Sequence, residues 1–272
     1  MGISKWIKGL GKNTLYYPGC LTKFVLEQEK ENYKKILLSL GIDFIMISEE
    51  LCCGMPVINA GYEKDARNLA RKNYEILKKY SVNKIITNCP SCYSMFKDYK
   101  NLLPYWDIEV EHITITIRNK LKYSKIKQAS SEEVAYHDPC HLSRNSGISE
   151  EPREILKMIG YKIKEMKNNR ENSLCCGGGA GLKVNESEIA EKIARKRIGH
   201  AIDLGMKKLI TPCPLCFAHM KNSGKANAFP DSPKPRKVEG FGDKGIEVLE
   251  FSYVIGRALG LEVENVNEEI LR

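Results

Sequence analysis

The sequence contains no long hydrophobic run, and no stretch approaches the roughly 18 apolar residues of a membrane-spanning helix. Its first residues, MGISKWIKGLGK, are basic but lack both the apolar core and the small-residue cleavage site of a secretory signal. A G-x-G-x-x-G dinucleotide fingerprint is also absent. We therefore expect a soluble, cytoplasmic chain that has no transmembrane segment and no dinucleotide site of its own.

Charge of one sign is in only moderate excess. The 43 Lys and Arg residues against 34 Asp and Glu residues give a formal charge of +9. The basic residues are scattered between acidic ones and lack interleaved aromatic residues, so a nucleic-acid partner is not expected. The excess indicates lysine-rich, solvated helix faces, with an anionic substrate or an acidic partner protein as the alternative.

Cysteine, by contrast, is abundant, with ten residues in a chain of 272. In a thiol-reducing compartment so many cysteines point to metal binding or catalysis before disulfides. They form two series of one pattern, a lone Cys, a Cys-Cys-Gly and a Cys-Pro-x-Cys: Cys20, Cys52, Cys53, Cys89 and Cys92, then Cys140, Cys175, Cys176, Cys213 and Cys216. The groups are separated by 31 and 35 residues in the first series and by 34 and 36 in the second. The chain is therefore an internal duplication.

The segments around the cysteines alternate between strand-like and helix-like patterns. KIITNCPSCYSMFK (84–97) also matches KLITPCPLCFAHMK (208–221). Strands are predicted at 14–17, 42–47, 84–87, 133–137, 161–166 and 208–211, helices at 24–40, 62–80, 151–160 and 186–204, and a closing strand and helix within 107–121 and within 245–260. We predict an α/β fold of two tandem repeats, each a small, mostly parallel sheet with flanking helices, related by pseudo-twofold symmetry.

The domain organisation follows from this repeat. We expect an N-terminal extension over 1–13, a first domain over 14–129 and a second over 130–272, with the boundary in the polar stretch 125–134. In the extension, one helical face carries Ile3, Trp6, Ile7 and Leu10. This pattern predicts a basic amphipathic helix that packs on the chain's own core, on a partner subunit or on a membrane. Residues 222–245, rich in Gly, Pro and Lys, predict a mobile loop, with a substrate lid as the alternative.

The cysteine groups all lie where strands are expected to give way to helices. In a parallel sheet these loops meet at the carboxyl edge, so the five thiols of each half should converge. In Cys-Pro-x-Cys, the first Cys can cap a helix with Pro90 or Pro214 at its first position, and the second then lies beside free backbone amides that favour a thiolate. Glycines beside the cysteine pairs should let the backbone approach an inorganic group and direct amides at its sulfurs: Gly54, Gly177, Gly178 and Gly179.

Three kinds of site could explain the five thiols of each half. A structural zinc ion takes four thiolates and leaves one cysteine per half over. Disulfides need an oxidising compartment and would strain an adjacent Cys pair. An iron–sulfur cluster that uses all five, or four with the fifth nearby, is favoured, and zinc in a half is kept as the alternative. Five thiolates around a four-iron core of about +2 leave about −3, so amides, helix N-termini and lysines should be needed.

The ten cysteines in this register resemble the cysteine-rich CCG domain repeated twice, as in the B subunit of heterodisulfide reductase and the C-terminal part of its D subunit. The resemblance covers residues 14 to about 265. It implies that each half holds a noncubane [4Fe-4S] cluster through its five cysteines. It also implies that a small disulfide or thiol substrate lies between the two clusters, each delivering one electron as the S–S bond breaks.

The same double domain leaves other functions open. It is similar to the B subunit of thiol:fumarate reductase and to iron–sulfur subunits of glycolate, lactate and glycerol-3-phosphate oxidation complexes. The second hypothesis is therefore an electron-transfer subunit of an FAD-linked oxidising complex, and the third is a zinc-stabilised interaction module. The sequence has neither a ferredoxin-type C-x-x-C-x-x-C-x-x-x-C-P run nor a dinucleotide fingerprint. Electrons are therefore expected from a separate iron–sulfur or flavoprotein subunit.

The histidines are weaker candidates. His137 and His141 flank Cys140, and either could donate a proton to the thiolate released from a disulfide. The alternative is that both only orient the loop through hydrogen bonds. His219, one turn after Cys216, is weaker still, and we interpret His112 and His200 as structural.

Overall fold

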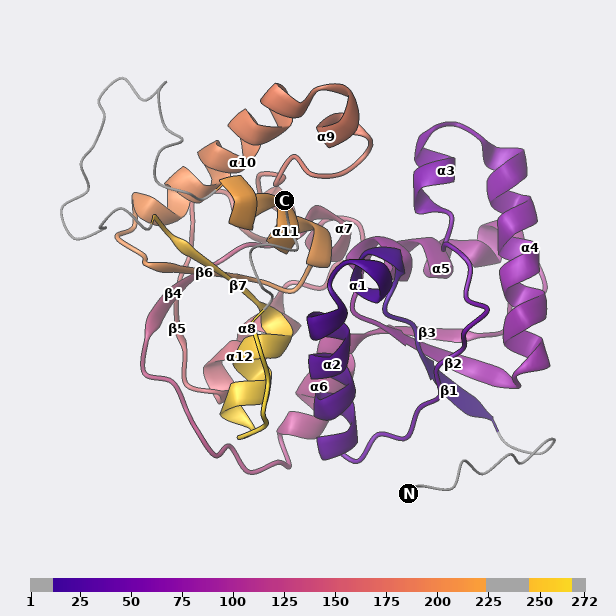
Figure 1. Ribbon diagram of the computed structural model, residues 1–272, viewed down its shortest axis with the longest axis horizontal. Helices are drawn as coiled ribbons and strands as arrows, with labels where there is room; N and C mark the ends of the chain where they lie inside the picture. Colours follow the sequence, from indigo (N-terminus) through magenta and orange to yellow (C-terminus); the bar gives the residue numbers. More distant parts are fainter. Residues whose placement is uncertain (1–11, 224–244, 266–272) are drawn as a thin grey trace.

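The computed structural model describes residues 12–223 and 245–265, which form two parallel sheets side by side, each flanked by helices (Figure 1). The predicted N-terminal amphipathic helix and nearly all of the predicted 222–245 loop lie outside these residues. The two-repeat α/β fold expected from the cysteine series is confirmed.

The first half contains a three-stranded parallel sheet in the order β1-β2-β3. Its elements are β1 (Asn13–Tyr16), α1 (Cys20–Phe24), α2 (Glu27–Ser39), α3 (Met55–Asn59), α4 (Glu63–Lys79), β2 (Val82–Thr87), α5 (Pro90–Leu102), β3 (Glu109–His112) and α6 (Ile113–Leu121). The predicted helix over 62–80 is thus α4. It buries Ala66, Ala70, Asn73 and Leu77, whose spacing of three and four residues defines one helix face.

The second half repeats this order around a four-stranded parallel sheet, β5-β4-β6-β7. Its elements are β4 (Glu133–Tyr136), α7 (Cys140–Ser143), α8 (Glu150–Met158), β5 (Lys162–Lys164), the 3-10 helix η1 (Arg170–Asn172), α9 (Leu182–Asn185), α10 (Ser187–Ile202), β6 (Lys208–Thr211), α11 (Pro214–Ser223), β7 (Glu247–Glu250) and α12 (Phe251–Ala258). The predicted helix over 186–204 is α10.

The halves differ at the sheet edge that β5 occupies. The strand predicted over 42–47 stands at the equivalent edge of the first sheet, but only Ile45 pairs with β1, through a single bridge to Leu15. Ile45 donates to the Thr14 carbonyl at 2.9 Å and accepts from the Tyr16 amide at 3.0 Å. The prediction of a full strand is therefore wrong, although the segment takes the expected place.

The two halves are joined by four helices that lie between the sheets (Figure 1). The last helix of the first half, α6, packs on α8, and the last helix of the second half, α12, packs on α2. Since α2 and α8 occupy equivalent places in the repeat, these two contacts are reciprocal, as the predicted pseudo-symmetry requires. They enclose one apolar core to which both halves contribute, with Tyr33 and Ile36 on α2 and Ile155 on α8 fully buried.

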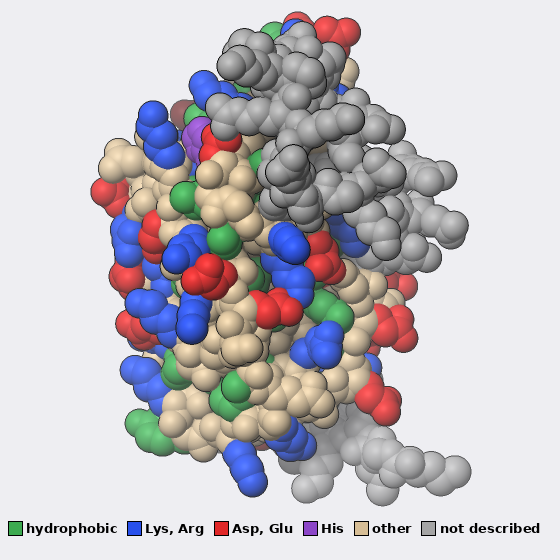
Figure 2. All heavy atoms as spheres, turned by 90° about the vertical axis from the view of Figure 1, so that its left-hand side faces the viewer, with side chains coloured by type: hydrophobic (Ala, Val, Ile, Leu, Met, Phe, Trp, Pro, Cys, Tyr) green, Lys and Arg blue, Asp and Glu red, His purple; other side chains and the backbone are tan. Residues whose placement is uncertain are grey.

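The surface carries mixed charge. On the outer face of the second half, Lys and Arg side chains are interspersed with Asp and Glu (Figure 2). Among the pairs of this half are Lys208 with Glu132 at 2.5 Å and Arg195 with Glu191 at 2.7 Å. No helix of the part of the chain that the structure describes is long and apolar enough to cross a membrane.

Candidate iron–sulfur centres

The first site consists of Cys20, Cys52, Cys53, Cys89 and Cys92, which the structure brings together. Cys20 begins α1 directly after β1, and the Cys52–Cys53 pair lies in the loop before α3. Cys89 caps α5 with Pro90 at its first position, as expected from the sequence. The thiols contact one another in series, in the order Cys20, Cys52, Cys53, Cys92 and Cys89.

The second site consists of Cys140, Cys175, Cys176, Cys213 and Cys216, in the equivalent places of the second half. Cys140 begins α7 after β4, and α11 starts at Pro214, directly after Cys213. The thiols contact one another in the matching order Cys140, Cys175, Cys176, Cys216 and Cys213. All ten cysteines are free thiols in the structure.

The cysteine pairs receive backbone amides from the glycines that follow them. The Gly54 amide donates to the Cys52 sulfur at 3.4 Å, and the Gly177 and Gly178 amides donate to Cys175 and Cys176 at 3.4 Å. Gly177 has a φ of +84°, and a Cβ there would lie 2.7 Å from the Ala190 carbonyl oxygen. For Gly179, the described residues provide no such amide–sulfur contact, and a Cβ would meet only Leu215, at 3.8 Å.

Gly19 is a site residue that the sequence reasoning missed. Its φ of 79° and ψ of 161° lie in a region that is essentially restricted to glycine. A Cβ at this position would lie 3.0 Å from the Cys92 sulfur and 3.3 Å from the Cys89 Cβ. Gly19 therefore allows the loop after β1 to pass close to α5. The sequence signal that could have revealed this role is the glycine directly before Cys20. At the equivalent position, before Cys140, the second half has Pro139.

Hydrogen bonds lower the pKa of one thiol in each site. Cys52 accepts from Cys20, from Cys53 and from the Gly54 amide, which lowers the pKa of Cys52 to about 2. Cys175 accepts from Cys140, Cys176 and the Gly177 amide, which lowers its pKa to about 2 as well. Each cysteine pair therefore presents a thiolate, the form that binds a metal.

The loop before Cys140 is anchored by a buried arginine. Arg153 of α8 donates to both carboxylate oxygens of Asp138, at 2.6 and 2.8 Å, and to both oxygens of Glu165, at 2.7 and 2.8 Å. Arg153 and Asp138 are each only 1% exposed. A bidentate pair of this kind fixes the loop in two directions, since the guanidinium fork is rigid.

A buried polar chain joins the first site to the second half. The Asn88 amide, next to Cys89, donates to the Thr22 hydroxyl at 3.1 Å, and Thr22 donates to Glu29 at 3.3 Å. Glu29 is hydrogen-bonded to Glu250, which also accepts from Tyr33 at 3.0 Å. Burial, followed by the charge of Glu250, raises the pKa of Glu29 well above its usual value.

His137 is fully buried, and the structure places one of its ring nitrogens within 4.8 Å of the sulfurs of Cys176 and Cys216. Its Nδ1 accepts from Arg197 Nε at 3.0 Å, whereas its Nε2 has no hydrogen-bond partner among the described residues. A buried ring nitrogen without a partner, beside the sulfurs of Cys176 and Cys216, fits a bound group that carries hydrogen-bond acceptors, and sulfide or thiolate sulfur is such an acceptor. The donor set of the second site therefore fits an iron–sulfur cluster.

The other histidines lie as follows. His141 is half-buried, and its Nδ1 lies 3.2 Å from the Asn145 side-chain amide. His219 is buried against the Ala190 carbonyl at 3.1 Å and packs on Gly178. His112 caps α6, with burial lowering its pKa to about 3, in line with the predicted structural role.

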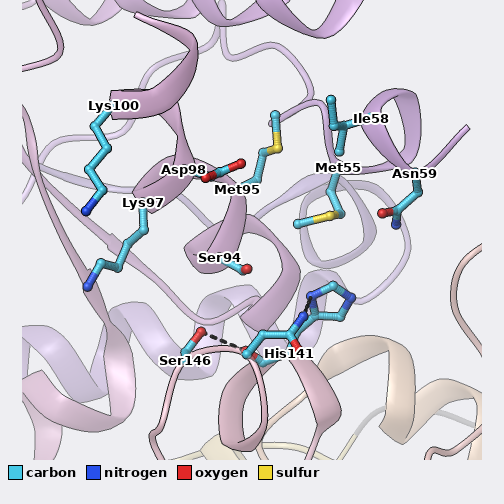
Figure 3. Close-up of a pocket in the computed structure, with 11 residues that line it drawn as sticks. Met55, Ile58, Asn59, Ser94, Met95, Lys97, Asp98, Lys100, His141 and Ser146 are labelled. Atoms are coloured by element: carbon cyan, nitrogen blue, oxygen red, sulfur yellow. Dashed lines mark hydrogen bonds between the residues drawn. The ribbon is translucent and has the colours of Figure 1, made fainter. Parts of the chain in front are cut away.

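A cavity of about 420 Å³ opens between the halves (Figure 3). The first half contributes Met55, Ile58 and Asn59 from α3 and Ser94, Met95, Lys97, Asp98 and Lys100 from α5, and the second half contributes His141, Asn145 and Ser146. Met55 directly follows Gly54 of the first site, and His141 directly follows Cys140 of the second. The cavity therefore lies against residues next to both sites.

A family model for the cysteine-rich domain (CCG) matches residues 14–97 and again residues 134–221. The chain is 34% identical over 261 residues to the D subunit of dihydromethanophenazine:CoB–CoM heterodisulfide reductase from Methanosarcina acetivorans, and the match covers 93% of this chain and 60% of that protein. It is 31% identical over 217 residues to the B subunit of fumarate reductase (CoM/CoB) from Methanothermobacter marburgensis, covering 78% and 42%.

Two further comparisons concern an iron–sulfur relative and the fold. An uncharacterized iron–sulfur protein of Methanocaldococcus jannaschii is 33% identical over 247 residues, which are 90% of this chain and 46% of that protein. The chain thus spans between 42% and 60% of the length of these three relatives. The crystal structure of a hypothetical protein from Helicobacter pylori matches with a TM-score of 0.60 at 15% identity, over 97% of this chain and 51% of that chain.

Proposed function

The chain belongs to the cysteine-rich (CCG) domain family, and from this premise we propose that it is an iron–sulfur subunit of a heterodisulfide reductase-like oxidoreductase. In this proposal each site holds one noncubane [4Fe-4S] cluster through its five cysteines. A small disulfide is reduced, or two thiols are oxidised, between the sites. The relatives bearing heterodisulfide reductase and CoM/CoB fumarate reductase names favour this function over an FAD-linked 2-hydroxy-acid or glycerol-3-phosphate oxidising complex.

The observation that carries the proposal is that five free thiols come together in each half. In both halves they contact one another in the same order. A zinc site would use four of the five and leave the fifth without a role. Five thiolates around a four-iron core of about +2 carry about −3, which needs nearby donors. The amides of Gly54, Gly177 and Gly178 and the N-termini of α5 and α11 supply them.

The cavity between the halves is the proposed place of the disulfide. Cleavage of an S–S bond consumes two electrons and two protons and gives two thiols, and two clusters that each supply one electron match this stoichiometry. The methionines Met55 and Met95 give the cavity an apolar, polarizable wall that suits a sulfur-containing ligand. The charged residues of its lining are Lys97, Lys100 and Asp98, which leaves one positive charge in excess.

One of the two predicted proton donors lines this cavity. His141 faces it beside Ser146, whose hydroxyl donates to the His141 carbonyl at 2.7 Å (Figure 3). Burial lowers the pKa of His141, so the ring is neutral at rest and protonates a released thiolate only after it takes up a proton from solvent and forms the imidazolium. We assign this role to His141 alone, since His137 is fully buried and is not among the residues that line the cavity.

The electrons are exchanged with a partner iron–sulfur or flavoprotein subunit in this proposal. The names of two relatives describe subunits, which supports a complex. Ten free thiols would need a reducing compartment such as the cytoplasm to stay reduced. Copurification with a redox partner tests this part, and a chain that reduces disulfides with NADH unaided contradicts it.

Anaerobic purification with iron, sulfide and zinc analysis tests the proposed cofactors. About eight irons and a similar amount of sulfide per chain are expected for two four-iron clusters. Cys176→Ser should remove about half of both, with Cys53→Ser as the matched change in the first site. Two zinc ions per chain without sulfide would end the redox proposal.

A further inference from the structure

His137 has an unusual partner for a histidine beside cysteine thiols. It lies three residues before Cys140, at the end of β4, and its Nδ1 accepts a hydrogen bond from Arg197 Nε of α10 at 3.0 Å. Arg197 is itself fully buried and is held in place by the Lys167 and Asn168 carbonyls, at 2.9 and 3.0 Å, and by the Ser173 hydroxyl at 3.2 Å. The guanidinium therefore has a fixed position and can only donate.

This contact decides which ring nitrogen carries the proton. A guanidinium has no acceptor, so Nδ1 of His137 must offer its lone pair, and the neutral ring carries its proton on Nε2. Nε2 has no partner among the described residues, although His137 is fully buried. A buried N–H without an acceptor is destabilising, which indicates that the acceptor belongs to a bound group.

The same contact argues against direct ligation by His137. A ligating histidine needs one bare nitrogen for the metal, and it usually donates its other N–H to a carboxylate or a carbonyl. Here the outer nitrogen faces a cation, so ligation through Nε2 would place a proton on Nδ1 directly against Arg197. The proximity of His137 to Cys176 and Cys216 therefore suits a hydrogen bond to sulfur rather than a bond to metal.

The first half lacks this arrangement at the equivalent positions. YYPGC (16–20) matches YHDPC (136–140), and LARKNYEIL (69–77) matches IARKRIGHA (193–201), so Tyr17 replaces His137 and Asn73 replaces Arg197. The Tyr17 hydroxyl donates to the Leu51 carbonyl at 2.6 Å. The Asn73 amide donates to the Cys52 carbonyl at 2.9 Å and to the Tyr99 hydroxyl at 3.0 Å. These donors are already satisfied within the protein.

We propose that His137, held as its Nε2–H tautomer by the positioning residue Arg197, donates a hydrogen bond to a sulfur of the cluster at the second site, and that the second cluster is therefore the more easily reduced of the two. The inference rests on the proposed function, because it requires a cluster at each site. Hydrogen bonds to sulfur and a nearby positive charge stabilise the additional negative charge of a reduced cluster and raise its potential. The two clusters thus differ in reduction potential, and the first electron that enters the chain resides on the second cluster.

The test compares two substitutions of one side chain in the anaerobically purified chain. His137→Met keeps much of the volume but removes the donor, whereas His137→Gln keeps an N–H in a similar place. An EPR-monitored redox titration then gives the potential of each cluster, with Cys176→Ser and Cys53→Ser assigning the signals. We expect His137→Met to shift the oxidised-to-reduced ratio of the second cluster at least tenfold towards the oxidised form, which is a drop of about 59 mV for a one-electron couple. His137→Gln should show little of this drop and keep the second cluster close to its wild-type potential.

Matched controls separate this role from a structural one. Tyr17→Phe removes a hydroxyl at the equivalent place of the first half and should leave the potential of the first cluster unchanged. An unchanged second cluster in His137→Met, or an equal drop in both clusters, would overturn the proposal. A wild-type chain without iron and sulfide would instead refute the proposed function.

A second measurement needs no substitution. In the wild-type chain labelled with ¹⁵N-histidine, pulsed EPR should detect a weak nitrogen coupling at the second cluster, transmitted through a hydrogen bond, and none at the first. A strong coupling, as from a ligating nitrogen, would refute the donor role, and so would the absence of any coupling.

Discussion

Gly19→Ala should damage the first site selectively. The substitution places a Cβ 3.0 Å from the sulfur of Cys92 and 3.3 Å from the Cβ of Cys89, closer than such contacts normally come. Cys92 is only 4% exposed and cannot move aside easily. Gly19 also has φ 79° and ψ 161°, where any other residue costs roughly 1–3 kcal/mol. This strain alone lowers the equilibrium constant between the assembled and the disrupted first site by about 5- to 150-fold.

The assay is iron and sulfide content after anaerobic purification. About four irons per chain are expected for Gly19→Ala instead of about eight, with the signals of the second cluster retained. Gly41→Ala is the control, since Gly41 also has a positive φ, of 69°, but a Cβ there would meet nothing within 4 Å. Full iron content in Gly19→Ala, or an equal loss in Gly41→Ala, would refute the argument that close approach of this loop to α5 builds the site.

Three further predictions concern the buried networks and the cavity. Arg153→Met leaves the buried carboxylate of Asp138 without its main partner, which should lower the free energy of unfolding by about 3–5 kcal/mol. Thermal unfolding measures this loss. The double variant Arg153→Met with Asp138→Asn should recover part of it, because it also removes the unpaired charge. Because the pKa of Glu29 is raised in the folded protein, the folded state holds a proton that the unfolded state releases above about pH 4.3, so stability falls as pH rises towards the folded pKa, by up to about 1.4 kcal/mol per pH unit. Glu29→Gln should reduce that fall in stability, measured by urea unfolding at pH 5.5 and 8.5, but not remove it, because burial raises the pKa of its partner Glu250 as well; an unchanged slope would show that another group causes it. Ser94→Trp, at a half-buried position of the lining, should fill the cavity and abolish disulfide reduction with iron content unchanged, whereas Tyr123→Trp, at a 90% exposed position, should have no effect; activity retained in Ser94→Trp would place the substrate elsewhere.

The repeat of the cysteine pattern made the fold and the grouping of the thiols predictable. Spacing within each half, together with the rule that parallel strands end at one edge, was enough to place Cys20 near Cys52 and Cys89. The prediction of a full strand over 42–47 was wrong because the pattern of apolar residues does not determine how many backbone hydrogen bonds an edge segment makes. Within this segment only Ile45 pairs with β1.

Contacts between distant segments were beyond the reach of sequence reasoning. Arg197 lies on a helix that was correctly predicted, yet nothing local indicates that its guanidinium reaches His137, 60 residues earlier. The reciprocal contacts of α6 with α8 and of α12 with α2 could not be predicted either, because no local sequence pattern specifies which distant helices pack together. Aligning the two halves residue by residue would have drawn attention to Arg197, because the first half has Asn73 there.

The reciprocal helix contacts have a consequence for the connection between the halves. Because each half completes the core of the other, the segment between α6 and β4 is not what holds the two sites at a fixed separation. A chain cut within this segment should stay assembled, and two separately produced halves should find each other in solution. An isolated half, in contrast, would expose the apolar faces of two helices and would need a substitute partner to hide them.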